Sequence, residues 1–231
     1  MVIGSWPRPT EAARRRLTRV LSRAAFALGI AAGLGCGVPA VAQTATPLPM
    51  TLSRLADGVW LIPGEAGADG RHNGCRTRHV GAVETQAGWV LIGSGQTREH
   101  GERIRATLAR QSPLPIALLI RLDASAASAG GEAAFADVPR GALRNAWRVS
   151  ESPRLRDSRL LRCGPEARGS GALAPTRELR TGGVEIGGRR FELLELDGRT
   201  ASDLVLVDRA TGTVFLGGLV TVGQLPVAEE G

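Results

Sequence analysis

The chain has 231 residues, a length that suits one domain with a real core, and its basic residues are all arginine. Residues 1–42 hold six of the 29 arginines and one of the 22 acidic residues, so the remainder carries 23 basic against 21 acidic side chains. This near balance, together with the small number of aromatic residues, excludes nucleic acid as an expected partner.

The first 42 residues have the layout of a secretory signal peptide. Five arginines between Arg14 and Arg23 precede the apolar run 24–38, which is short for a membrane span, and "AVA" at 40–42 forms a cleavage site before Gln43. We therefore expect a periplasmic or secreted protein without membrane attachment once the leader is removed. The stretch "RRRLTR" leaves twin-arginine export open beside Sec export, and Cys36 leaves lipidation open.

The first half of the mature chain predicts strands around one helix. After a mobile tail at 43–51, a domain is expected over 52–231. Residues 58–64 predict a strand, and 79–95 predict a hairpin that turns at 86–88. Ile104 and Leu108 recur at helical spacing, which predicts an amphipathic surface helix over 97–110. The apolar run 114–122 predicts a fully buried strand.

The second half is less regular. A short helix is expected from about Gly131, and 138–181, rich in Arg, Gly, Ser and Pro, is expected to be an irregular insert. Two hairpins should follow, over 184–196 with a turn at Gly187–Gly188 and over 203–218 with a turn at 210–212. Strands and helices in this order predict an α/β (α+β) fold.

Four segments together resemble the metallo-β-lactamase superfamily. "NGCRTRHVGAVETQAGWVLIGSG" (73–95) is similar to its opening hairpin, which usually ends in "IDTG". "LIRLDASAASAGGEAAF" (119–135) lies over its metal loop, T-H-x-H-x-D-H-x-G-G, without a gap. "GRTASD" (198–203) and "FLGG" (215–218) lie over its G-H-T-x-G-D and F-x-G-D motifs. The resemblance covers about 52–228 and implies an αββα sandwich, shortened at the C-terminus because the family continues further.

The metal ligands of the resembling motifs are replaced by other residues. Catalytic zinc takes three protein ligands and one water, whereas Ala and Gly cannot ligate and Arg places a permanent cation at the site. We therefore expect no cofactor and no catalytic residue. The positions that correspond to ligands are Gly93, Asp123, Ser125, Ala127, Ser128, Arg199 and Gly218.

These replacements suggest a different site. Asp123 and Arg199 are expected to pair across it, and Ser125 and Ser128 are expected to cap the following helix. A helix N-terminus beside an arginine can hold a small anion. Asp123, Ser125, Ser128 and Arg199 are therefore the candidate binding residues.

Two further sets of residues leave alternatives open. His72, Cys75 and His79 form H-x2-C-x3-H, and with Asp123 they are candidate zinc ligands if the chain is a divergent hydrolase; otherwise they are polar loop residues. Cys75 and Cys163 are the two cysteines left after leader removal, so they form either one disulfide or two separate thiols.

Three functional hypotheses follow. The first is an exported, non-catalytic pseudoenzyme that binds a small anion or a protein partner. The second is a divergent metallo-hydrolase with a non-standard zinc site, and the third is a nonfunctional or truncated gene product. The early end predicts exposed apolar strand faces at 204–207 and 214–220, which a homo-oligomer or complex would cover.

Two short stretches add a biological setting. "NGCR" (73–76) and "QLPV" (224–227) resemble the exported quinoprotein-relay zinc metallohydrolase branch, which accompanies periplasmic PQQ-dependent alcohol oxidation. That similarity implies a setting for the protein, periplasmic alcohol oxidation, more than it implies a reaction.

Overall fold

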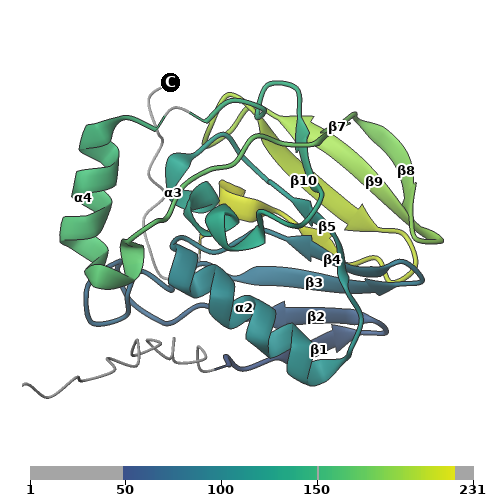
Figure 1. The fold of residues 1–231 in the computed structure, drawn as a ribbon. Coiled ribbons are helices and arrows are strands. Elements are labelled where there is room, and N and C mark those ends of the chain that lie inside the picture. The colour runs from purple at the N-terminus through teal and green to yellow at the C-terminus, as the bar shows by residue number, and fades with distance from the viewer. Residues whose placement is uncertain (1–48, 150, 222–231) are drawn as a thin grey trace, which may run out of the picture. The chain divides into compact units, whose positions relative to one another are not determined.

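The computed structural model describes residues 49–149 and 151–221 (Figure 1). The signal peptide expected at 1–42 and the "QLPV" stretch lie outside these residues. None of the helices in the described ranges is long and apolar enough to cross a membrane.

A seven-stranded sheet holds the first seven strands in chain order. β1 to β4 pair antiparallel, whereas β4 to β7 pair parallel. The strands are β1 (Ser53–Ala56), β2 (Val59–Ile62), β3 (Val80–Thr85), β4 (Gly88–Ile92), β5 (Ile116–Ile120), β6 (Arg140–Leu143) and β7 (Arg177–Leu179).

The second sheet has four antiparallel strands in the order β11-β10-β9-β8. They are β8 (Gly182–Ile186), β9 (Arg189–Leu196), β10 (Asp203–Asp208) and β11 (Val214–Phe215). The helices are α2 (Arg98–Gln111), α3 (Ala126–Ala129) and α4 (Pro153–Cys163), with 3-10 turns at Gly130–Phe135, Pro165–Ala167 and Gly217–Leu219.

The three predicted hairpins are confirmed: β3–β4, β8–β9 and β10–β11 pair across the expected turns. The β3–β4 turn depends on Gly88, which has φ +124° and comes so close to Pro115 that an added Cβ would lie 2.2 Å from its carbonyl oxygen. This close approach lies where β5 begins beside β4, and the two strands pair parallel.

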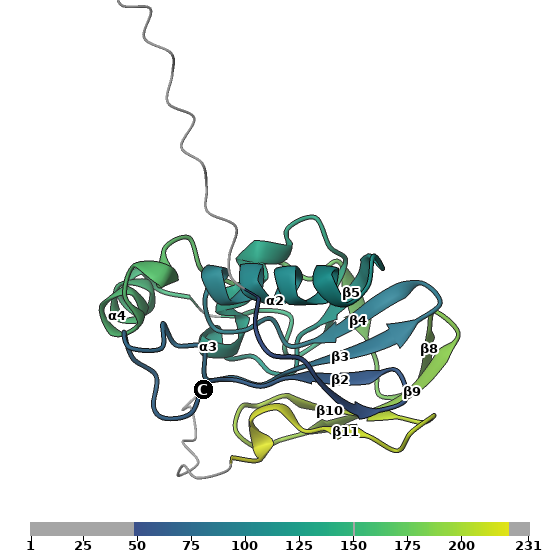
Figure 2. The ribbon, with the colours of Figure 1, turned by 90° about the horizontal axis from the view of Figure 1, so that it is seen from below.

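The two sheets pack face to face, and α2 covers the far side of the first sheet (Figure 2). Between the sheets lies one apolar cluster that includes Val83, Ile120, Phe191 and Leu206. A second cluster beneath α2 includes Trp89, Ile104, Leu108 and Phe135. The amphipathic spacing of α2 therefore serves the core, and the predicted mixed α/β fold is confirmed.

One expectation about an irregular segment was wrong. The range 138–181 contains β6, α4 and β7, so much of it is regular. Residues 43–48 of the expected tail lie outside the described residues; beyond them, Met50 packs beneath α2 and its backbone N donates to the Thr107 hydroxyl at 2.7 Å. The short helix expected near Gly131 begins earlier, at Ala126.

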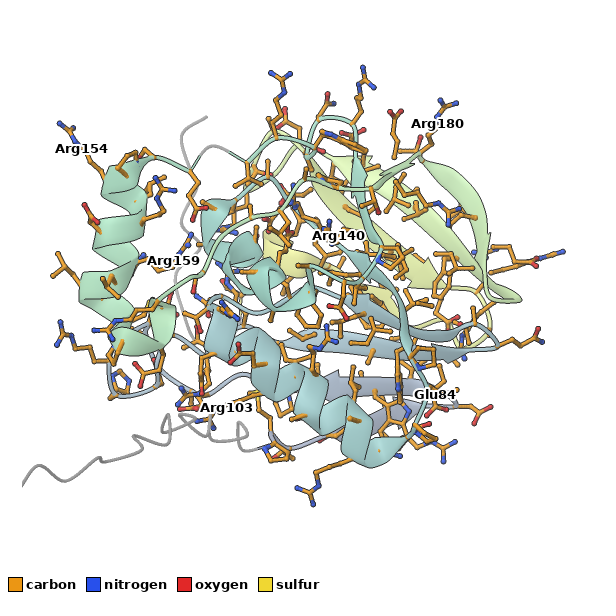
Figure 3. All side chains as sticks on the ribbon, viewed as in Figure 1. Glu84, Arg103, Arg140, Arg154, Arg159 and Arg180 are labelled. Carbon is orange, nitrogen blue, oxygen red and sulfur yellow. A yellow bond between two sulfur atoms is a disulfide. The ribbon has the colours of Figure 1, made fainter. Side chains whose placement is uncertain are left out.

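Helix α4 is anchored by polar and covalent contacts. Cys163 forms a disulfide with Cys75 in the loop before β3. Arg159, directed toward the body of the domain while Arg154 points outward (Figure 3), donates to Glu151 at 2.5 Å and to the Ala126 carbonyl at 2.6 Å. These contacts join α4 to α3 and to the loop 64–79.

Candidate functional site

The candidate site is a cavity of about 330 Å³ at the carboxyl ends of β4 and β5. This edge of a sheet with parallel strands is where ligands commonly bind. The walls come from 77–80 before β3, 93–95 after β4, 119–123 at the end of β5, and residues between 217 and 221 after β11. The fold thus brings together the segments that resemble metal-site motifs.

Polar residues after β5 hold the backbone of the turn. Ser125 is the N-cap of α3, and its hydroxyl accepts a hydrogen bond from Ala127 N at 3.2 Å. Asp123 Oδ1 accepts from Ser125 N at 3.0 Å and also from the Ser128 hydroxyl. Asp123 and Ser125 are both buried. Residues at three metal-ligand positions therefore form a capped turn.

Arg199 enters the site from the second sheet. Its Nη1 lies 3.4 Å from Asp123 Oδ2, and its Nη2 lies 3.4 Å from the Ser125 hydroxyl. A Cβ added at Gly218 would lie 2.8 Å from Arg199 Cδ. The arginine side chain therefore occupies the room that a side chain at 218 would need.

These residues do not fit a zinc ion. Gly93, Ala127 and Gly218 carry no donor atom, and the Asp123 carboxylate is engaged by two hydrogen bonds and a guanidinium. Gly93 has φ +89°, a backbone conformation that an aspartate there would rarely adopt. Within the described ranges, no group of three His, Cys, Asp or Glu side chains could hold a metal ion.

The alternative zinc site at His72, Cys75 and His79 is contradicted by the bonding of Cys75. Cys75 is bonded to Cys163, so it has no thiolate to offer. The ring of His79 borders the cavity and its Nδ1 accepts from Gly64 N at 2.8 Å, whereas His72 is not among the cavity's lining residues. The three side chains thus do not share one centre.

A buried ion pair that the sequence did not predict lies on the cavity wall. Arg121 follows β5, and Glu132 lies in the 3-10 turn after α3; both side chains are almost fully buried. Arg121 donates to both carboxylate oxygens, at 2.7 and 2.5 Å, and to the carbonyls of Ala146, Trp147 and Leu173. The sequence does show an arginine directly after an apolar strand, which is a sign of a buried charge. Nothing in the sequence marks Glu132, 11 residues later, as its partner.

A third acid on the wall is also engaged by the protein. Asp69 accepts hydrogen bonds from Gln96 Nε2 at 2.7 Å and from the Thr77 hydroxyl at 2.5 Å. The three lining acids, Asp69, Asp123 and Glu132, therefore all accept bonds from neighbouring side chains.

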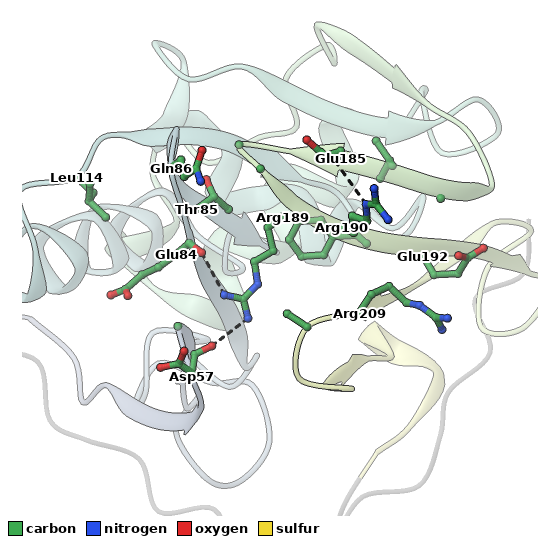
Figure 4. Close-up of a pocket in the computed structure, with 17 residues that line it drawn as sticks. Asp57, Glu84, Thr85, Gln86, Leu114, Glu185, Arg189, Arg190, Glu192 and Arg209 are labelled. Carbon is green, nitrogen blue, oxygen red and sulfur yellow. Dashed lines mark hydrogen bonds and ion pairs between the residues drawn. The ribbon is translucent and has the colours of Figure 1, made fainter.

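A larger cavity of about 1180 Å³ lies where the β3–β4 turn meets the β8–β9 hairpin (Figure 4). At its centre Arg189 donates to both Asp208 oxygens, at 2.9 and 2.7 Å, and to the backbone carbonyls of Asp57 and Glu84. Burial acts to raise the pKa of Asp208, but hydrogen bonds from Arg189 and Thr211 outweigh it and lower that pKa. Arg189 thus ties the two sheets together.

Comparisons with known proteins place the fold. No family model and no curated protein matches the sequence. Among solved structures, a metallo-β-lactamase from Pontibacter korlensis is similar at 19% identity over 76% of this chain and 74% of that chain, with a TM-score of 0.54. One from Hirschia baltica is similar at 19% identity over 78% and 79%, with a TM-score of 0.52.

A third match is metallo-β-lactamase IND-7, at 15% identity over 76% of this chain and 73% of that chain, with a TM-score of 0.53. At such identities the likeness establishes the fold alone. The chain therefore has a metallo-β-lactamase-like fold, as its motifs implied, and its function must be argued from its own residues.

Proposed function

We propose that this chain is a non-catalytic protein of the metallo-β-lactamase fold that binds a small anion in the cavity at the ends of β4 and β5. The observation that carries the proposal is the placement of Arg199. Its side chain fills the room beside Gly218 and meets Asp123, so a fixed positive charge stands where the family's motifs would hold a metal ion.

A small carboxylate or phosphate is the ligand class that suits this cavity. Arg78 and Arg199 line it, and guanidinium groups bind such anions through paired N–H donors. A guanidinium has five N–H donors, so one side chain can hold Asp123 and a ligand together. The volume of about 330 Å³ matches a small molecule.

The proposal includes export to the periplasm or the medium. The leader at 1–42 supports it, and an oxidising compartment would sustain the Cys75–Cys163 disulfide. The similarity to the quinoprotein-relay branch adds PQQ-dependent alcohol oxidation as the setting. Cell fractionation with N-terminal sequencing should find the chain outside the cytoplasm and beginning at Gln43; an uncleaved cytoplasmic chain would reject this part.

Metal analysis tests the loss of the zinc site. We expect less than stoichiometric zinc in the purified protein, and no hydrolysis of β-lactams or thioesters, because the ligand positions lack donors. One tightly bound zinc per chain, lost in His72→Ala, would overturn the proposal and favour the divergent hydrolase.

Thermal shift measurements test anion binding. Oxalate, malonate and inorganic phosphate serve as probes, and a ligand at 100 times its Kd should raise Tm by roughly 5–10 °C. Arg199→Gln should abolish the shift, whereas Arg154→Gln, on the exposed side of α4, should keep it. Equal responses of the two variants, or no shift with any probe, would contradict the proposal.

A further inference from the structure

The charged side chains that line the candidate cavity balance one another. Three arginines and three acids are among the lining residues: Arg78, Arg121, Arg199, Asp69, Asp123 and Glu132. Arg121 pairs with Glu132 at 2.5 Å, and Arg199 lies 3.4 Å from Asp123. These six charges sum to zero. A ligand that brings one charge of each sign keeps this balance, whereas a purely anionic ligand disturbs it.

Asp69 differs from the other two lining acids in its partners. Among the described residues, no arginine or histidine lies within ion-pair distance of its carboxylate. Its two oxygens accept hydrogen bonds from neutral groups, the Thr77 hydroxyl at 2.5 Å and the Gln96 amide at 2.7 Å. An ionised carboxylate has about four acceptor sites, so Asp69 keeps room for a cationic donor from the cavity.

Gln96 joins Asp69 to the arginine side of the wall. Its Nε2 donates to Asp69, and its Oε1 accepts from the backbone N of Thr77 and of Arg78, at 3.2 and 3.1 Å. Asp69 therefore adjoins the segment that bears Arg78. The ammonium and carboxylate groups of an α-amino acid are attached to one carbon atom, so they need an acid and a guanidinium that adjoin in this way.

Apolar residues form another part of the lining. The expectation of exposed apolar strand faces at 204–207 and 214–220 is wrong for Leu204 and Leu206, which are buried, but Val220 is 56% exposed. Val220 and Leu122 both line the cavity. Ligand pockets typically combine such apolar contacts with a few polar groups that fix the ligand's orientation. An aliphatic group on the ligand therefore has residues to contact.

We propose that the ligand of this cavity is a zwitterionic α-amino acid with an aliphatic side chain. The inference rests on the proposed function, because Arg199 and Arg78 hold the carboxylate. Asp69 accepts a hydrogen bond from the ammonium group, and the aliphatic side chain contacts Leu122 and Val220. Phosphate and simple dicarboxylates offer no cation to Asp69, so they use only part of the site.

Isothermal titration calorimetry on the unmodified protein tests the inference with matched ligands. L-valine and 3-methylbutanoate share a carbon skeleton and a carboxylate, and only L-valine has the ammonium group. We expect L-valine to bind about 10-fold or more tightly, because it adds a charge-assisted hydrogen bond to Asp69. L-leucine and 4-methylpentanoate form a second pair with a longer aliphatic part.

Substitution of Asp69 tests where the ammonium group binds. Asp69→Asn should remove the preference for the amino acid and leave 3-methylbutanoate bound as before, because the amide has a similar shape and no charge. Asp157→Asn is the matched control, because Asp157 is exposed on α4, and it should keep the preference. A preference that survives in Asp69→Asn would overturn the inference. The comparison on the unmodified protein decides the matter even if Asp69→Asn fails to fold.

The same titrations separate failure of this inference from failure of the proposed function. Equal affinities within both ligand pairs, with binding lost in Arg199→Gln, would overturn the amino-acid inference and leave anion binding standing. If neither these ligands nor oxalate, malonate or phosphate binds, the proposed function is itself wrong, and the inference fails with it.

Discussion

The buried ion pair between Arg121 and Glu132 makes a sharp prediction about stability. Glu132→Ala removes both charge-assisted hydrogen bonds to the guanidinium and the acceptor of Leu173 N. The guanidinium stays buried with three backbone carbonyls as partners. Breaking a buried pair in this way destabilises a protein by about 3–5 kcal/mol. That is a large share of the net stability of a domain, and Tm should fall by roughly 10 °C.

Urea denaturation followed by circular dichroism measures this change without adding salt. Glu178→Ala is the control, because Glu178 pairs with the exposed Arg144 and a surface pair is worth under about 1 kcal/mol. The double variant Arg121→Met/Glu132→Leu should be more stable than Glu132→Ala, because no buried charge is left unpaired. A loss of stability of less than about 1 kcal/mol in Glu132→Ala would contradict this prediction.

Two further predictions concern pH and redox state. Burial, and next the charges of Arg76 and Arg103, lower the pKa of His100 to about 4 in the folded protein. As the pH falls, the His100 side chain is therefore protonated in the unfolded chain before it is protonated in the folded one. The free energy of unfolding should fall by about 3 kcal/mol between pH 6.5 and 4 for this reason. His100→Gln should lose that share of the pH dependence, and parallel curves would contradict it. The disulfide closes a loop over a separation of 88 residues, so Cys75→Ser/Cys163→Ser should destabilise the fold by about 4.5 kcal/mol in the chain-entropy model. Equal urea midpoints with and without reductant would count against that.

The sequence predicted the hairpins and α2 because they carry simple periodic patterns. The hairpins show apolar strand segments separated by turn residues, and the apolar residues of β3, β4, β9 and β10 lie in the core. In α2, Ile104 and Leu108 mark the buried side of the helix. These patterns follow directly from which face is buried.

Helix α4 was not predicted because its buried side carries no aliphatic or aromatic residues. Arg159 and Cys163 are its only buried positions, so hydrophobic periodicity was absent. The start signals were present, however: Ser152 is the N-cap and Pro153 is the first helical residue. Strands β6 and β7 have four and three residues, too few to show alternation.

The candidate site was predictable only as a set of segments. The motif alignment put Asp123, Ser125, Ser128 and Arg199 together, and the structure places them within hydrogen-bond or near hydrogen-bond distance. It could not show that Glu132 reaches back to Arg121, because that contact depends on how the 3-10 turn after α3 packs. Pairings set by tertiary packing leave no mark in a single sequence.

The contact between Arg199 and Gly218 couples the two positions on any mutational route from this cavity to a metal-binding one. An aspartate introduced at Gly218 would meet the outer part of the flexible Arg199 side chain, which can shift, and would pair with its guanidinium. Arg199→His alone would remove the cationic partner of Asp123 without supplying a second carboxylate. The effect of each substitution therefore depends on the residue at the other position, so we expect the two to be epistatic. Directed evolution of zinc binding on this scaffold should therefore vary both residues in one library.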